Sequence, residues 1–404
     1  MLKRRYIPCL LGAALLAFLP TRTGRVLAQG AICGPFTDVA SSNGFCPFIL
    51  EAFITSITQG TSPTTFNPND PVTRAQAATF FTRTMDQTLH RGTVRTAMGK
   101  SWAPSSTFGG VATEVGGAVN DIVTDGIYLW IARADGKILT VNAANRRLIE
   151  TWSLAAGAGV PRKLGVFAGL VWIADDQGRL HTFSPADLPG NASLLFNAGA
   201  TGVSVGASAL AFDGANVWLA SSGGSKIFIY QVLNPGGFAL TVPANVEGMV
   251  FDGTYMWVLL ANSNLLRMSV PTAGATVPAV VETVTIPGTV TESRMLYDGN
   301  SIWIPIGSTP GTLYVVRPSR SLSSPSTIVL NQSIPDVLFP LVAAFDGENV
   351  MIGGINNGVV ALYNATSLTL IRTFPSGAFG VRGIASDGRT FNVSDYLGTR
   401  FFQF

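Results

Sequence analysis

Charge and reactive side chains are scarce in this sequence. Of its 404 residues only 12% are charged, and it contains two histidines, His90 and His181, and three cysteines. Two histidines cannot complete the three-histidine ligand set of a catalytic zinc site. No basic cluster occurs beyond the N-terminus, which argues against a nucleic-acid partner. We therefore expect no metal centre built on histidine and no nucleic-acid binding.

Long apolar runs are also missing, except near the N-terminus. Lys3, Arg4 and Arg5 precede an apolar run over 7–19, and small residues follow as far as Ala28. This order is typical of a secretory signal, and Arg4-Arg5 leaves a twin-arginine signal open, so we expect residues 1–28 to be a signal peptide. No other stretch is long enough to span a bilayer. The sequence thus predicts an exported protein, extracellular or envelope-associated, without a transmembrane segment after signal removal.

Two cysteines remain beyond the predicted signal. Cys33 and Cys46 are close in the sequence, and an oxidising compartment favours a disulfide between them. The alternative is a pair of metal ligands, but no histidine lies nearby to complete such a site. We expect the disulfide.

A repeated motif fills most of the chain: an apolar run, a turn ending in glycine, and a second apolar run. It occurs seven times between residues 121 and 400, with successive turn glycines 39 to 48 residues apart. The turn glycines are Gly126, Gly169, Gly214, Gly253, Gly299, Gly347 and Gly388. A period of this length, with β-branched and aromatic runs broken by turns, predicts a radial β-sheet repeat.

Each repeat is predicted to form four strands, which in the first repeat are 120–124, 128–132, 137–142 and 147–152. Seven such units make a seven-bladed β-propeller over 113–404, so the fold class is mainly β with a small N-terminal α-helical module. A large residue recurs on the second strand: Trp130, Trp172, Trp218, Trp257, Trp303, Met351 and Phe391. We expect it to fill the wedge between blades rather than to stack on a cofactor.

The last repeat ends one strand short, after 399–404. We expect a segment at about 101–111, within a linker over 89–112, to supply the missing outer strand of the final blade. That pairing would close the ring and remove its exposed sheet edges.

Residues 33–88 do not follow the repeat. Ile49, Phe53 and Ile57 share a helical face that Gly60 can end, and Thr73 with Gln76 reads as a capping box. Five segments, in this order and spacing, resemble one S-layer homology domain: Phe36-Thr37-Asp38-Val39, an aromatic helix, Ile57-Thr58-Gln59-Gly60, Phe66-Asn67-Pro68 and Val72-Thr73-Arg74-Ala75-Gln76.

This resemblance implies binding to acidic or pyruvylated cell-wall polysaccharide, and it makes Arg74 a ligand contact through its planar guanidinium. The sequence departs from the family pattern in having one copy where three are usual, and Gln76 where Glu is usual. A purely structural role, with Thr73 and Gln76 capping a helix and Asp38 fixing a loop, is the alternative.

The repeat array resembles virginiamycin B lyase-like and lactonase-like propellers over 115–404. The lyase-like enzymes use catalytic His and Glu residues at inner positions, whereas His181 falls on a predicted third strand, so no such pair can be matched here. No Gly-x-Ser-x-Gly elbow falls on a predicted strand-to-helix turn, and no cysteine is spare. The resemblance therefore implies the fold, and we assign no catalytic residue.

Candidate ligand-binding residues lie where inner strands begin, because propeller ligands generally bind over the central channel. These residues are Asp121, Arg162, Lys163, Glu247, Arg294 and Arg382. Four cations against two carboxylates favour an anionic ligand such as an acidic glycan, although mixed, solvated charges are the alternative. We expect no cofactor; a calcium site formed from Asp175 and Asp176 stays open.

These observations favour an exported, envelope-associated, non-enzymatic protein. Its module would bind cell-wall polysaccharide and its propeller would present a surface to a protein or a glycan. The alternative is an extracellular hydrolase or lyase of a lactone or polysaccharide, with carboxylates such as Asp121 and Glu247 converging at the channel. A third possibility is a structural role in an extracellular layer.

Overall fold

The computed structural model describes residues 32–54, 57–88, 110–154, 159–184, 193–196, 206–221, 223–232, 236–271 and 277–404. The predicted signal peptide and most of the predicted linker lie outside these residues. The chain divides into two compact units, residues 1–87 and 88–404. Within the described part, no helix is long and apolar enough to cross a membrane.

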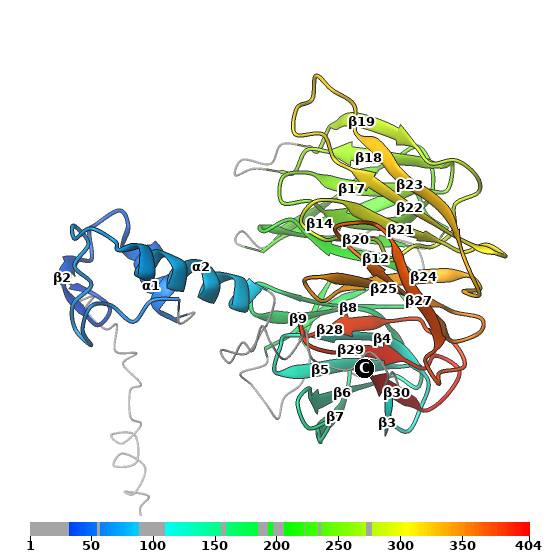
Figure 1. The fold of residues 1–404 in the computed structure, drawn as a ribbon, viewed down its shortest axis with the longest axis horizontal. Helices are drawn as coiled ribbons and strands as arrows, with labels where there is room; N and C mark the ends of the chain where they lie inside the picture. Colours follow the sequence, from blue (N-terminus) through cyan, green and yellow to red (C-terminus); the bar gives the residue numbers. More distant parts are fainter. Residues whose placement is uncertain are drawn as a thin grey trace, which may run out of the picture. The chain divides into compact units, whose positions relative to one another are not determined.

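The described part of the N-terminal unit is a small module of two short strands and two helices (Figure 1). Its elements are β1 (Ile32–Cys33), β2 (Phe36–Ala40), α1 (Cys46–Ile54) and α2 (Arg74–Thr88). The Cys33–Cys46 disulfide ties β1 to the start of α1, with a Cα–Cα distance of 5.7 Å, and confirms the predicted pairing. Phe36, Val39 and Ile49 form the buried core beside the disulfide.

The helix predictions for this module are partly confirmed. Helix α1 ends at Ile54, so Ile57 and Gly60 lie beyond it, and Gly60 adopts a φ of 76° in the following turn. The capping box is present: the Gln76 amide donates to Thr73 Oγ1 at 3.2 Å, and the Thr73 amide donates to Gln76 Oε1 at 2.8 Å. Because these bonds satisfy two otherwise unpaired amides, they fix the start of α2.

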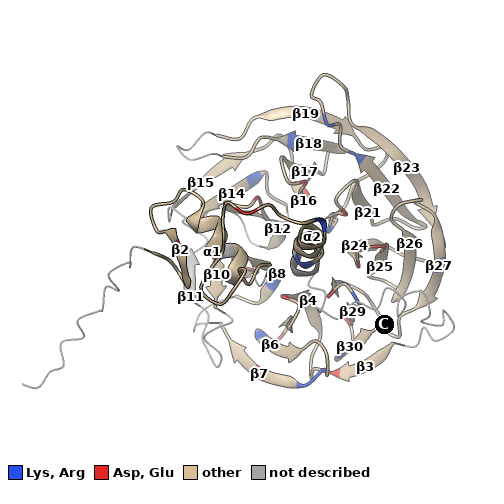
Figure 2. Cartoon of the chain, turned by 60° about the vertical axis from the view of Figure 1, so that its left-hand side comes forward, with Lys and Arg blue, Asp and Glu red and all other residues tan. Residues whose placement is uncertain are grey.

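The second unit is the predicted seven-bladed propeller (Figure 2). Blade 1 consists of β4 (Val119–Thr124), β5 (Tyr128–Arg133), β6 (Lys137–Asn142) and β7 (Leu148–Ser153), within two residues of the expected bounds. In blades 1 to 6 the strands follow one another in chain order, and Figure 2 shows β4, β8 and β12 near the centre and β7, β15, β19 and β27 at the rim.

The other blades have the following strands. Blade 2 has β8 (Pro161–Phe167), β9 (Leu170–Asp175), β10 (Leu180–Phe183) and β11 (Ser193–Phe196); blade 3 has β12 (Ala207–Phe212), β13 (Asn216–Ser221), β14 (Lys226–Gln231) and β15 (Gly236–Thr241). Blade 4 has β16 (Val246–Phe251), β17 (Met256–Leu260), β18 (Asn264–Met268) and β19 (Val280–Thr285); blade 5 has β20 (Leu296–Tyr297), β21 (Ile302–Ile306), β22 (Gly311–Arg317) and β23 (Thr327–Ile334). Blade 6 has β24 (Pro340–Phe345), β25 (Asn349–Gly354), β26 (Val359–Asn364) and β27 (Leu370–Pro375).

Blade 7 closes the ring with both ends of the propeller. It combines β28 (Ile384–Ser386), β29 (Phe391–Ser394) and β30 (Arg400–Gln403) with β3 (Val111–Glu114), which comes before blade 1 in the chain. The closing strand is therefore present, but it begins at Val111, where the expected segment ends; residues 101–109 lie outside the described part. Phe404 is also paired, since its amide donates to the Phe391 carbonyl at 2.9 Å.

Large second-strand residues fill the spaces between blades, as predicted. The five tryptophans are at most 1% exposed, and Met351 and Phe391 are also buried. Among the described residues, seven buried clusters each join two neighbouring blades; one places Trp257 of blade 4 against Ile302 and Ile304 of blade 5. Each blade thus covers the apolar face of the next.

The aspartate of the turn has a second task that the sequence prediction missed. In blade 4 one Asp252 oxygen accepts the Thr254 and Tyr255 amides, and the other accepts the Trp257 indole at 2.7 Å. Blades 1, 3 and 5 repeat this indole bond with their own aspartates. The aspartate therefore links the hairpin turn to the wedge residue.

Candidate functional site

The inner strands begin with a shared backbone irregularity at one end of the ring axis. A register shift of the β-bulge type occurs at the start of β4, β8, β12, β16 and β24. Such bulges redirect the side chains that follow them. We call this end of the axis, with the residues that begin the inner strands, the mouth.

Equivalent mouth positions carry different residues in each blade. The positions that follow the register shift are Asp121, Lys163, Ala209, Gly248 and Val342. In blade 5, where Arg294 precedes the short strand β20, the Arg294 amide donates to the Leu341 carbonyl of blade 6 at 2.7 Å. Charge at this level is therefore concentrated in blades 1, 2 and 5.

Two ion pairs cross the axis from blade 5 to blades 1 and 2, each three blades away around the ring. Arg294 pairs with Asp121, and Lys163 Nζ lies 2.5 Å from Glu292 Oε1. Both cations are largely buried, with side-chain exposures of 13% for Arg294 and 6% for Lys163. Because the partners are far apart in the sequence, the closed ring alone brings them together.

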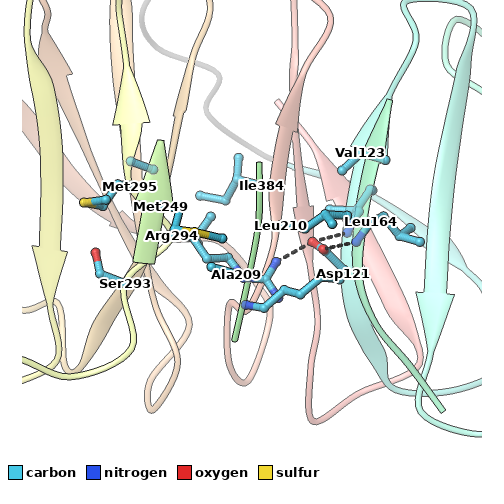
Figure 3. Close-up of a pocket in the computed structure, with 14 residues that line it drawn as sticks. Asp121, Val123, Leu164, Ala209, Leu210, Met249, Ser293, Arg294, Met295 and Ile384 are labelled. Atoms are coloured by element: carbon cyan, nitrogen blue, oxygen red, sulfur yellow. Dashed lines mark hydrogen bonds and ion pairs between the residues drawn. The ribbon is translucent and has the colours of Figure 1, made fainter. Parts of the chain in front are cut away.

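Asp121 is held rigidly. Its carboxylate accepts the Ile122 amide at 2.9 Å and the Leu164 amide of the next blade at 2.8 Å, besides the Arg294 guanidinium. Arg294 also donates to the Asn120 carbonyl at 3.0 Å. These bonds align the guanidinium and the carboxylate, as Figure 3 shows.

The second pair has strongly altered acidities. Burial and the neighbouring Arg294 charge outweigh the attraction of Glu292 and Asp121, and together they lower the pKa of Lys163 to about 8. Burial alone would raise the pKa of Glu292, but Lys163, Arg294 and Arg382 outweigh it and lower the value to about 2. Glu292 therefore stays ionised down to acidic pH.

Three further charges at the mouth have no ion-pair partner within 4 Å among the described residues: Arg162, Glu247 and Arg382. Burial, together with the neighbouring charges of Arg294 and Arg162, lowers the pKa of Arg382 despite the attraction of Glu292. Its guanidinium lies over the Tyr396 ring, 4.6 Å from the centroid. Burial and the nearby Glu292 charge raise the pKa of Glu247.

A cavity of about 170 Å³ lies on the axis and is lined by the inner region of every blade (Figure 3). Asp121, Lys163, Ser293 and Arg294 supply its polar wall. The remaining lining is apolar: Ile122, Val123, Leu164, Ala209, Leu210, Met249, Met295, Val342, Ala343 and Ile384. The axis thus combines a charged mouth with a small chamber that has both charged and apolar walls.

The structure brings together most of the candidate residues chosen from sequence. Asp121 forms an ion pair with Arg294. Arg382 interacts electrostatically with Arg162 and Arg294. Glu247 lies near the charge of Glu292. Glu292 was not selected from the sequence, although it precedes Arg294 by two residues. The strand β20 that follows is too short for its pattern to show that the residues before it also face the axis. Ligand binding by these residues stays a prediction.

Arg74 belongs to the other unit, where it begins α2 and is exposed. Asp38 has the structural role considered above: it accepts the Phe66 and Asn67 amides, and the first of these bonds lowers the pKa of its carboxyl. Contact between Arg74 and a glycan stays a prediction.

His181 and Asp175, one of the two aspartates considered for calcium, form a structural contact in blade 2. His181 lies on the third strand, as predicted, and its Nε2 is 3.0 Å from Asp175 Oδ2. The buried Asp175 carboxylate also accepts amides of Gly159, Gln177 and Arg179. Burial opposes its ionisation, but the bonds from His181 and the backbone outweigh this and lower its pKa.

Calcium binding at this position stays a prediction. A calcium ion would have to replace the N–H donors that already hydrogen-bond to the Asp175 oxygens. Among the described residues, no group of three or more His, Cys, Asp or Glu side chains is arranged to hold a metal ion.

Comparison with known proteins supports the N-terminal assignment. Residues 35–78 match the S-layer homology domain. No curated protein matches the chain. The resemblance of the repeat array to virginiamycin B lyase-like proteins is not confirmed, so the propeller is defined by its fold and the module by its family.

Proposed function

We propose that this chain is a cell-surface protein whose propeller binds an acidic glycan through Arg162 and Arg382 at the mouth. Its S-layer homology domain indicates cell-surface association and binding to cell-wall polymers. The propeller would then meet acidic polymers of the envelope, which present carboxylate or phosphate groups at intervals.

The observation that carries this proposal is that Arg162 and Arg382 have no ion-pair partner in the part of the chain that the structure describes. The described cations Lys163 and Arg294 are already paired across the axis, whereas the charges of Arg162 and Arg382 oppose each other. An anion between them would relieve this repulsion, and a planar guanidinium binds carboxylate or phosphate with two parallel hydrogen bonds. Glu292 and Asp121 balance the paired cations, so the two arginines outnumber Glu247, the remaining carboxyl group of the mouth.

Calorimetry of the full chain with polygalacturonate, and with neutral dextran as the comparison, tests the glycan site. We expect polygalacturonate to bind with an affinity that falls as salt rises, and each of Arg162→Ala and Arg382→Ala to weaken it about tenfold. Arg317→Ala is the matched control, because this exposed arginine ends the third strand of blade 5, away from the mouth. Unchanged binding by the Arg162→Ala/Arg382→Ala double variant would exclude the mouth as the site.

A separate experiment tests attachment by the module. Native protein and an Arg74→Ala variant are sedimented with purified bacterial cell wall, again with Arg317→Ala as the control. We expect the Arg74 substitution to weaken the affinity for the cell wall by about tenfold, so that less protein sediments with it. Equal sedimentation would assign Arg74 to the solvated surface of α2.

A second candidate function, polysaccharide hydrolysis, has one observation in its favour. The environments of Glu247 and Glu292 move their pKa values in opposite directions, which is the arrangement expected of an acid and a base. The enzyme alternative derived from the sequence combined Glu247 with Asp121, but Asp121 is paired with Arg294. Release of reducing ends from an acidic polysaccharide, lost in Glu247→Gln while binding persists, would favour this function over binding alone.

A further inference from the structure

Lys163 differs from the other described lysines in its surroundings. It is 5% exposed and lines the axial cavity, whereas Lys137 and Lys226 are exposed on strands of blades 1 and 3. Its Nζ lies beside Glu292 and within the field of the Arg294 charge. A lysine removed from water next to another cation is a recognised form of activated amine.

The cavity beside Lys163 has the size of a small organic molecule. Its volume of about 170 Å³ is close to that of an engineered apolar cavity of about 150 Å³ that binds benzene. Leu210, Met249, Met295 and Ile384 supply apolar walls, as Figure 3 shows. A ligand here would be about as large as benzene and would combine an apolar body with a polar group.

Two buried hydrogen-bond donors on residues that line the cavity lack an acceptor among the described residues. Ser293 is 1% exposed, and neither its Oγ nor the neighbouring Arg294 Nε has a hydrogen-bond partner in that part of the chain. Leaving buried polar groups unpaired is unfavourable, so a ligand oxygen that accepts from them would be stabilised. The charges of Asp121, Lys163, Glu292 and Arg294 balance, which favours a neutral ligand over an additional ion.

We propose that Lys163 is a nucleophilic amine that forms an imine with a small aldehyde or ketone bound in the axial cavity. The carbonyl oxygen would accept from Ser293 and Arg294, and the apolar body would contact the walls. This activity is separate from glycan binding at the mouth, because it requires Lys163 and the cavity rather than Arg162 and Arg382.

The reaction balances without a further reagent. The Lys163 ammonium first releases a proton to solvent; its free electron pair then attacks the carbonyl carbon, and the former C=O π pair moves to oxygen. Proton transfer from nitrogen to that oxygen gives a neutral carbinolamine, and a further proton lets the oxygen leave as water, forming the iminium. The lowered pKa of Lys163, about 8, means that a substantial fraction of free amine is present in mildly basic solution.

Reductive trapping tests the proposal on the full chain. The protein is incubated at pH 8 with benzaldehyde and cyanoborohydride, which reduces the iminium to a stable amine, and labelled lysines are located by peptide mass spectrometry. We expect Lys163 to be labelled at least about tenfold faster than Lys137 and Lys226, because those two lysines are exposed to water and do not line the cavity. Pyrenecarbaldehyde, which is too large for the cavity, should label Lys137 and Lys226 but not Lys163.

Two matched serine variants test the position of the carbonyl. Ser293→Ala should slow labelling of Lys163 by about fivefold, the value of one hydrogen bond. Ser221→Ala should leave it unchanged, because Ser221 does not line the cavity, although it is equally buried and its hydroxyl also lacks a partner among the residues described. Labelling of Lys163 no faster than that of the exposed lysines, or equal labelling by both aldehydes, would overturn the proposal, and neither outcome depends on a variant folding.

Discussion

The two ends of the inner strands follow different rules. At the turn end, an aspartate and a bulky residue recur in almost every blade, and in four blades the aspartate accepts from the tryptophan of its own blade: Asp125, Asp213, Asp252 and Asp298. At the mouth, equivalent positions range from Asp121 and Lys163 to Ala209 and Gly248. Every interface between blades must be filled by a similar bulky residue, so packing repeats the same residue types at the turn end. The mouth surrounds a single axis, and packing there does not require equivalent positions to carry the same residue.

This difference separates residues that the fold needs from residues that it permits. Blades 3, 4 and 6 carry Ala209, Gly248 and Val342 at positions where blades 1 and 2 carry charge, and all of them are complete four-stranded sheets. A charge at the mouth is therefore not required to build a blade. Since burying charge is unfavourable, the stability of the fold does not account for the presence of the cross-axis pairs.

The largest effect should come from removing a wedge residue at the turn end. Trp257→Ala deletes a fully buried indole between blades 4 and 5, and we expect it to lower the free energy of unfolding by about 3–5 kcal/mol. Trp257→Met, which copies the residue of blade 6, should cost less because it refills part of the space. Urea unfolding followed by circular dichroism measures both; a loss below about 1 kcal/mol for the alanine variant would show that the wedge is not what holds the ring.

At the mouth, a smaller but still large effect is expected from breaking one cross-axis pair. Arg294→Met leaves the buried Asp121 carboxylate without its cation, and we expect a loss of about 3 kcal/mol in the same assay. Arg400→Met is the control, because its pair with Glu114 in blade 7 is exposed and should contribute at most about 0.5 kcal/mol. Equal losses for the two variants would place the mouth pairs among ordinary surface contacts.

The repeating end could be predicted from sequence, because a period and a motif are both visible in one chain. The turn glycines and tryptophans gave the number of blades, and the first-blade strands were located within two residues. The closing strand was placed slightly too early, since β3 is defined by its partner β30 rather than by a pattern of its own.

The non-repeating end could be predicted only in part. Inner-strand starts were recognised, so Asp121 and Arg294 were chosen, but nothing local shows which of them pair across the axis. Lys163 and Glu292 are separated by 129 residues, and their contact depends on the closure of the whole ring. The pKa changes at the mouth follow from that closure and were equally invisible.

The smallest effect tests whether the turn aspartate serves the wedge as well as the turn. Asp252 accepts two turn amides and the Trp257 indole, whereas Asp387 accepts two turn amides in a blade where Phe391 replaces tryptophan. Asparagine can keep the turn bonds through its carbonyl oxygen, but its amide group cannot accept from an indole N–H. We therefore expect Asp252→Asn to cost about 1–2 kcal/mol more than Asp387→Asn in urea unfolding. Equal costs would mean that the aspartate recurs for the turn alone, and that the wedge residues hold their positions by packing without help from the hairpin.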